Sequence, residues 1–206
     1  MKKRKLFLLA AVMLGLGIIG TAVAFLTDTQ TLTNVFTIGG VKISLTEPTW
    51  DSTGKTKATN ITPKVKVEKD PTITNTGTND AYVFMKVVVP YENVTIDETT
   101  AFAQLFDYTL NSNWVEVGTA TTDESAKTIT HVYAYAADAT SAMTVLKKSE
   151  KAILFNDVTF ANVKNTNGLS SELNIVVTGY AIQTDNIVTG TATAANVWSV
   201  LESELN

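Results

Sequence analysis

The sequence predicts an all-β protein, an antiparallel β-sandwich with one or two short helices. Short segments with alternating apolar and polar residues recur along the chain, and clusters of turn-forming residues separate them at regular intervals. Threonine is abundant beside Val, Ile, Tyr and Phe, and all of these favour strands. A chain of 206 residues with 45% hydrophobic residues can build a core of its own, and we expect one sandwich domain over residues 39–206.

The first 24 residues have the layout of a secretory signal peptide. "MKKRK" is a basic start, "LFLLAAVMLGLGIIG" is an uncharged apolar run, and "AVA" places the small residues Ala22 and Ala24 where a signal peptidase cuts. We expect cleavage after Ala24, which makes Phe25 the new N-terminus. The alternative is an uncleaved membrane anchor, because the apolar run approaches the length of a span. Either reading places residues 28–206 outside the membrane.

Residues 25–38 form an N-terminal extension that reads as a strand. Leu32, Phe36 and Ile38 share one face of it, while the opposite face consists mainly of threonines. Gly39 and Gly40 follow, and the alternation then changes phase. A glycine pair at such a point predicts a bulge, kink or hinge between two strands.

The next segments alternate in turn. Val41, Ile43 and Leu45 predict a half-buried strand, "EPTWDSTGKTKATN" a polar loop, and Val65 with Val67 another strand. "KDPTITNTGTNDAYVFMKVVVP" reads as strand, turn and strand. Its apolar run "AYVFMKVVV" is typical of a central strand, and we expect Pro90 to end it.

The second half holds both predicted helices. Phe102, Leu105 and Phe106 lie at helical spacing after Asp97, a plausible N-cap, and predict a short helix over 97–106. "FDYTL", "WVEV", "TITHVYAYA", "KAILFNDVTF" and "LNIVVTGYAIQ" follow as strands. A stripe of Val197, Trp198, Leu201 and Leu205 predicts a C-terminal helix over about 193–205.

Residues that could carry chemistry are few, and we expect no catalytic, cofactor or metal site. The absence of cysteine excludes disulfides, thiolate metal sites and cysteine nucleophiles. The single histidine, His131, shares a strand face with Tyr133 and Tyr135, and no zinc-peptidase or serine-hydrolase motif accompanies it. We interpret it as a packed or surface histidine. Trp50, Trp114 and Trp198 fit either packing or a glycan-stacking surface.

Charge argues against a nucleic-acid partner. The formal net charge is −4, and removing the four basic residues of the signal segment leaves 12 basic against 20 acidic residues, a net charge of about −8. Such a surface repels phosphate.

The segment "FLTDTQTLTNVFTIGGVKISLTEPTWD" resembles the start of the TasA/camelysin family of secreted proteins from Gram-positive bacteria. "KDPTITNTGTNDAYVFMKV", "FDYTLNSNWVEVG" and "LNIVVTGYAIQTD" extend the likeness over nearly the whole chain after the signal segment. The resemblance implies a jelly-roll-like sandwich, export by a dedicated signal peptidase, and location in the extracellular matrix or at the cell surface. It also implies assembly into biofilm fibres, head to tail, with the N-terminal strand of one subunit inserted into the next and a matrix protein as a further partner.

Three functions follow as hypotheses. The first is a matrix fibre subunit or accessory component that uses residues 25–38 as donor strand, with Leu32, Phe36 and Ile38 as anchors; the same strand could instead pair within its own subunit. The second is a camelysin-like surface metallopeptidase, although the sequence has no recognisable zinc-peptidase motif. The third is a monomeric surface module for adhesion or fibre anchoring.

Overall fold

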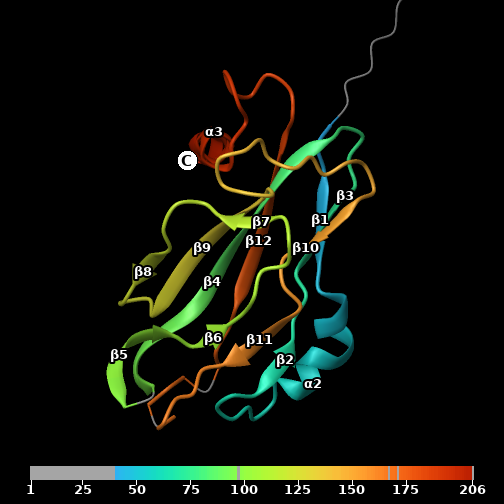
Figure 1. The fold of residues 1–206 in the computed structure, drawn as a ribbon. Coiled ribbons are helices and arrows are strands. Elements are labelled where there is room, and N and C mark those ends of the chain that lie inside the picture. The colour runs from blue at the N-terminus through green and yellow to red at the C-terminus, as the bar shows by residue number, and fades with distance from the viewer. Residues whose placement is uncertain (1–39, 97, 167, 171, 206) are drawn as a thin grey trace, which may run out of the picture. The chain divides into compact units, whose positions relative to one another are not determined.

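Two layers of antiparallel strands enclose the main core of the protein (Figure 1). The computed structural model describes residues 40–96, 98–166, 168–170 and 172–205, which belong to one unit, Gly39–Asn206. The prediction of an antiparallel β-sandwich with short helices is confirmed.

The first layer is a six-stranded sheet built on one long strand. This strand, β4 (Ala81–Ile96), lies between β12 (Val176–Gln183) and β9 (Thr128–Tyr135), and β9 also pairs with β7 (Trp114–Glu116) and β8 (Thr121–Asp123). The register places Val176 beside Val88 and Gln183 beside Ala81. Consequently β12 runs from the Val88 end of β4 toward its beginning.

The second layer consists of two three-stranded sheets that lie end to end. One contains β1 (Ile43–Thr46), β3 (Thr72–Asn75) and β10 (Lys151–Ile153), and the other contains β2 (Lys66–Glu68), β11 (Asp157–Phe160) and β6 (Phe106–Asp107). Backbone bonds from Leu154 N to Pro71 O and from Lys69 N to Asn156 O connect them. The predicted strands at Val67, at Thr72–Asn75 and over "KAILFNDVTF" are therefore present, the last as two strands.

Alternation along β4 assigns its residues to two cores. Val83, Met85 and Val87 face the second layer, whereas Tyr82 and Phe84 face the opposite side. This explains why the strand reads as apolar on both faces. The outer side is covered by α3 (Ala194–Leu205), whose Val197 and Leu201 are buried there, as the C-terminal stripe predicts. Trp198 packs beside them, while Leu205 stays largely exposed.

The prediction of a helix over residues 97–106 is wrong. The segment forms β5 (Thr99–Gln104), which pairs with the end of β4, followed by β6. Asp97 lies outside the described residues. Phe102 stacks on Tyr91 with ring centroids 5.5 Å apart, and Thr95 and Thr100 share a hydroxyl hydrogen bond across the pair. Cross-strand pairing of aromatic and β-branched residues thus overrides the helical spacing.

Pro90 does not end its strand, contrary to the prediction. The strand β4 continues to Ile96, and Pro90 stands where its partner changes from β9 to β5. Its carbonyl accepts a hydrogen bond from Leu105 N at 2.9 Å. A missing N–H is tolerated at such a switch because the ladder is interrupted there in any case.

The polar segment after β1 is helical rather than a loop, which corrects a further prediction. It contains the π-helical turn η1 (Trp50–Gly54) and α2 (Lys55–Lys57). The hydroxyls of Ser52 and Thr53 each donate to Thr49 O at 3.1 Å. The reason for the helix lies in a contact with Asp70, which is described with the site below.

Candidate strand-binding groove

Most residues that the sequence singles out lie outside the described part of the chain. They are Ala22, Ala24 and Phe25 at the predicted cleavage point, the candidate anchors Leu32, Phe36 and Ile38, and Gly39. Their roles stay predictions. Gly40, the second residue of the predicted hinge, is described.

The backbone of Gly40 is bound to the turn between β3 and β4. Its carbonyl accepts hydrogen bonds from Thr78 N at 3.1 Å and Asn79 N at 3.4 Å, and its N–H donates to Thr78 Oγ1 at 3.0 Å. Since this turn leads directly into Ala81, Gly40 lies near the end of the six-stranded sheet where β12 finishes. The backbone of Gly40 is thus attached to the sheet through this turn.

A close approach of two backbones makes this attachment specific. Thr76 N and Gly77 N both donate to Lys42 O, at 2.8 and 2.9 Å. A Cβ atom on Gly77 would lie 2.6 Å from Gly40 O and 2.7 Å from Lys42 N, so only glycine fits there. The buried amide of Asn75 accepts from Gly77 N and holds the turn in shape.

Each of the three sheets contributes one edge strand to the same side of the sandwich. Among the described strands, β12, β1 and β2 each have a partner on one side only. Val176 at the start of β12 is 53% exposed. An edge of this kind offers backbone N–H and C=O groups to an added strand.

An apolar groove of about 460 Å³ lies between the start of β12 and the second layer. Ile175 and Val177 approach it from the β12 side with the period of two that places them on one strand face. Val67, Phe106 and Val158 approach it from the opposite layer, and Trp50 closes it from the helical turn. Each of these side chains is apolar, so the groove suits apolar side chains of an extended segment.

A nearly buried ion pair lines the helical side of the groove. Lys69 Nζ lies 2.8 Å from both carboxylate oxygens of Glu47, and the two side chains are 8% and 19% exposed. The same ammonium lies 5.0 Å from the centre of the Trp50 ring. The pair therefore fixes the indole that closes the groove, through charge and a cation–π contact.

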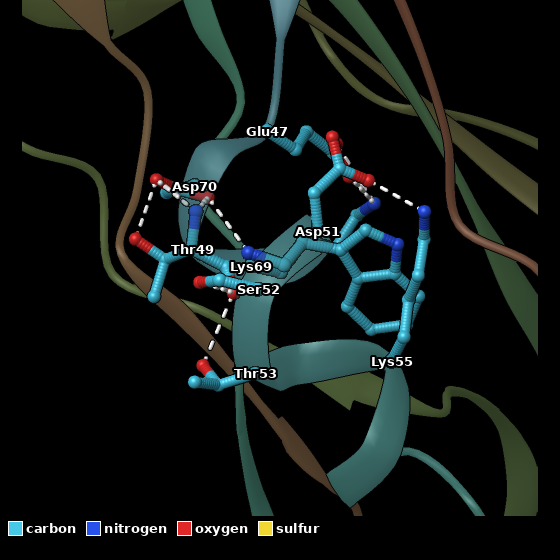
Figure 2. A network of polar contacts seen from close by, with 9 residues as sticks. Glu47, Thr49, Asp51, Ser52, Thr53, Lys55, Lys69 and Asp70 are labelled. Atoms are coloured by element: carbon cyan, nitrogen blue, oxygen red, sulfur yellow. Dashed lines mark hydrogen bonds and ion pairs between the residues drawn. The ribbon is translucent and has the colours of Figure 1, made fainter.

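Asp70 caps the helical turn from a distant point in the sequence (Figure 2). Its carboxylate accepts hydrogen bonds from Thr49 N at 2.9 Å, Trp50 N at 3.1 Å and Thr49 Oγ1 at 2.7 Å. The first N–H groups of a helix have no partner within the helix, and a carboxylate satisfies them well. Because the cap comes from residue 70, local sequence around Trp50 gives no sign of it.

The side chain of His131 is held by contacts with three neighbouring side chains. Its Nδ1 lies 2.7 Å from Glu116 Oε1, its Nε2 lies 2.8 Å from Gln104 Oε1, and its ring stacks on Tyr133. The imidazole thus connects β5, β7 and β9, with both ring nitrogens engaged. Tyr133 and Tyr108 share a hydroxyl contact of 2.9 Å, and burial raises the pKa of Tyr133 to about 12.

The three tryptophans differ in their surroundings. Trp114 is buried in the core at 5% exposure, and Trp50 lines the groove. Trp198 packs against Phe84 with ring centroids 5.2 Å apart and meets Tyr180 edge-on. The sequence left open whether each tryptophan packs in the core or forms a glycan-stacking surface. Trp114 packs in the core, whereas Trp50 and Trp198 occupy partly open positions.

No family model, curated protein or solved structure matches this chain. Over the described ranges, no three His, Asp or Glu side chains gather in a way that could hold a metal ion. The helices in the same ranges include none with the length and apolar character needed to cross a membrane. The geometry of the groove is therefore the basis for the functional proposal.

Sequence reasoning missed most of the groove. The sequence placed Glu47 in a predicted polar loop and gave Lys69 no role, and it placed Ile175 and Val177 in a predicted strand without linking them to a site. One available signal was the pair Lys69-Asp70 directly before a proline and a buried strand, since charges beside a core strand are commonly paired.

Proposed function

We propose that this protein is a secreted structural subunit of an extracellular matrix fibre, in which residues 25–38 of one copy enter the groove of the next. The observation that carries the proposal is the apolar groove beside the outer edge of β12. Strand addition to such an edge provides main-chain hydrogen bonds, and side-chain pockets provide specificity.

The N-terminal segment has the length and pattern that the groove requires. As an extended strand its 14 residues would span about 46 Å, and the eight residues of β12 span about 26 Å. Its apolar face offers Leu32, Phe36 and Ile38 to the lining, and its threonine face is suited to water. Strand pairing would thus be combined with burial of three large side chains.

Chain direction favours insertion into a second copy. Gly40 is held near the Gln183 end of β12, whereas the groove lies at the Val176 end. A segment that leads into Gly40 of its own copy would have to run parallel to β12. A segment from another copy is free to run antiparallel, the slightly more stable pairing.

A contact between the N-terminus of one copy and the groove of the next does not close on itself, so it grows a filament. Removal of residues 1–24 by a dedicated signal peptidase would free Phe25 and the strand behind it. Export and competence for assembly would then be coupled, and a matrix protein could bind the open groove at the end of a fibre.

Electron microscopy of protein that begins at Phe25 tests the proposal. We expect fibres from this protein, none after deletion of residues 25–38, and strongly reduced assembly for Phe36→Asp. Thr37→Asp, on the polar face, is the matched control and should assemble. A synthetic peptide of residues 25–38 in excess should block elongation. Fibres of unchanged form from the deleted protein would refute donor-strand assembly.

Engineered cysteines test the direction of insertion, since the chain has none of its own. Antiparallel insertion predicts that Thr37→Cys with Val176→Cys yields disulfide-linked oligomers on a non-reducing gel. Pairing of the segment within its own copy predicts instead an intramolecular disulfide between Thr37→Cys and Gln183→Cys. The second pattern alone would overturn insertion between copies.

Two other outcomes would redirect the assignment. Casein cleavage that a chelator stops and His131→Ala abolishes would support a camelysin-like peptidase. A protein that stays monomeric at every concentration while it binds to cell surfaces would support an adhesion module.

A further inference from the structure

A second concave site lies on the outer face of the six-stranded sheet, opposite the core layer. The helix α3 covers the part of this face formed by Tyr82, Phe84 and Ala134. Beyond them, Lys86 and Val132 pair in the register and remain half-exposed. A cleft of about 440 Å³ opens there, between the end of α3 and the strands β8 and β9, and its volume is in the range of small-molecule sites.

Two aromatic rings form one wall of the cleft. Tyr180 and Trp198 meet at 80° with ring centroids 5.7 Å apart, and Phe84 supports the indole from below. Such rings combine an apolar surface with a polar tip. They suit a ligand that is apolar on its faces and polar around its rim, which describes a pyranose ring.

Hydroxyl groups form the opposite wall. Thr121 and Thr130 stand directly opposite each other on adjacent strands, and Thr119 lies beside them on the connecting segment. Thr119 and Thr121 are exposed. Each hydroxyl can donate one hydrogen bond and accept others, which matches the paired character of sugar hydroxyls.

The charges in the cleft balance. Lys86 is the one charged residue in "AYVFMKVVV", and its ammonium lies 5.7 Å from the Tyr180 ring centre without an ion pair to any described residue. Glu202 lines the same cleft with a carboxylate. Lys86 and Glu202 carry opposite charges, and a cleft with no net charge favours an uncharged polar ligand, while the acidic protein repels anions.

We propose that this cleft binds a neutral hexose oligosaccharide. One sugar ring stacks on Trp198 beside Tyr180, Lys86 donates to its ring or hydroxyl oxygens, and the threonines bind hydroxyls along the rim. A fibre subunit with this site would hold polysaccharide along its length. The cleft is separate from the groove and does not depend on strand insertion.

Titration of isotope-labelled protein that begins at Phe25 and carries Phe36→Asp, which we expect to remain unassembled, tests the site through its backbone amide shifts. The probes are maltohexaose, cellohexaose and chitohexaose, with oligogalacturonate as the anionic comparison. We expect one neutral probe to shift amides in residues 119–121, 130–132 and 198–205, with a Kd of about 1 mM or tighter. Absence of shifts with all three neutral probes, or binding of oligogalacturonate alone, would overturn the proposal.

Point variants distinguish this cleft from an unspecific effect. We expect Thr121→Val to weaken binding about fivefold and Lys86→Met about tenfold, from lost hydrogen bonds. Thr122→Val is the matched control, because Thr122 is equally exposed on β8 but pairs with Ile129 toward the other face. Equal affinities of Thr121→Val and Thr122→Val would refute the assignment. Fibre formation should be unchanged in all of these variants.

Discussion

The ion pair between Lys69 and Glu47 permits a quantitative test of how the groove wall is held. Lys69→Met keeps the length of the side chain but leaves the Glu47 carboxylate, 19% exposed, without its partner. Removing one member of a buried pair costs about 3–5 kcal/mol. Because water reaches part of Glu47, we expect Lys69→Met to lower the free energy of unfolding by about 3 kcal/mol, at the lower end of this range. This loss corresponds to a decrease in Tm of about 6–12 °C.

The double variant Lys69→Met/Glu47→Leu removes both charges together with the cost of burying them. We therefore expect it to lie within about 1 kcal/mol of the parent, and so to be about 2 kcal/mol more stable than Lys69→Met alone. Equilibrium unfolding in urea, followed by circular dichroism, measures all members of the cycle.

The exposed pair Lys55–Asp51 provides the control for this cycle. Its side chains are 62% and 60% exposed, and Figure 2 shows the pair on the helical segment that contains η1 and α2. Lys55→Met should cost at most about 0.5 kcal/mol. The reasoning is wrong if Lys69→Met costs no more than Lys55→Met, or if the double variant is as unstable as the single one.

Three further predictions concern other parts of the fold. Gly77→Ala should push the turn away from Gly40 and lower the free energy of unfolding by about 2–4 kcal/mol, measured in urea, since the new Cβ meets backbone atoms at 2.6 and 2.7 Å; a neutral effect would show that the close approach is not required. Asp70→Ala should cost about 2–3 kcal/mol in the same assay through loss of the helix cap, whereas Asp70→Asn, which keeps one acceptor, should cost less; equal effects of the two would contradict stabilisation by the hydrogen bonds that residue 70 accepts. Burial raises the pKa of Tyr133 to about 12 and also raises that of Tyr108, so the folded state holds these protons more tightly than the unfolded state. Their stabilisation is complete below pH 10 and is lost as the pH rises toward 12; urea unfolding at pH 8, 10 and 11 should show this decline, and a flat profile would contradict it.

Alternation along the chain was sufficient to predict most strands. Val67 and the segment of His131 lie in strands, as their period of two predicts. The run over Ala81–Val89 lies in a central strand, as its apolar character on both faces predicts. The stripe through Val197 and Leu201 predicted the C-terminal helix for the same kind of reason, a period of 3.6. These elements depend on side-chain pattern, which is local.

Local pattern failed where a distant partner decides the conformation. Phe102, Leu105 and Phe106 fit a helical spacing, but the end of β4 offers strand pairing and an aromatic partner in Tyr91. The segment at Trp50 looked like a loop because its cap, Asp70, lies 20 residues away. In each case hydrogen bonds across the fold exceed a weak local preference.

The sequence by itself determined the strand-rich class and the lack of cysteine chemistry, both of which follow from composition and short-range order. Only the tertiary structure decided where an apolar groove forms. The groove brings together Trp50, Val67, Phe106, Val158 and Val177, which are far apart in the chain and come from both layers. Their proximity results from the crossing of the chain between two sheets and from the ion pair that holds Trp50 in place, and no local sequence pattern specifies either one.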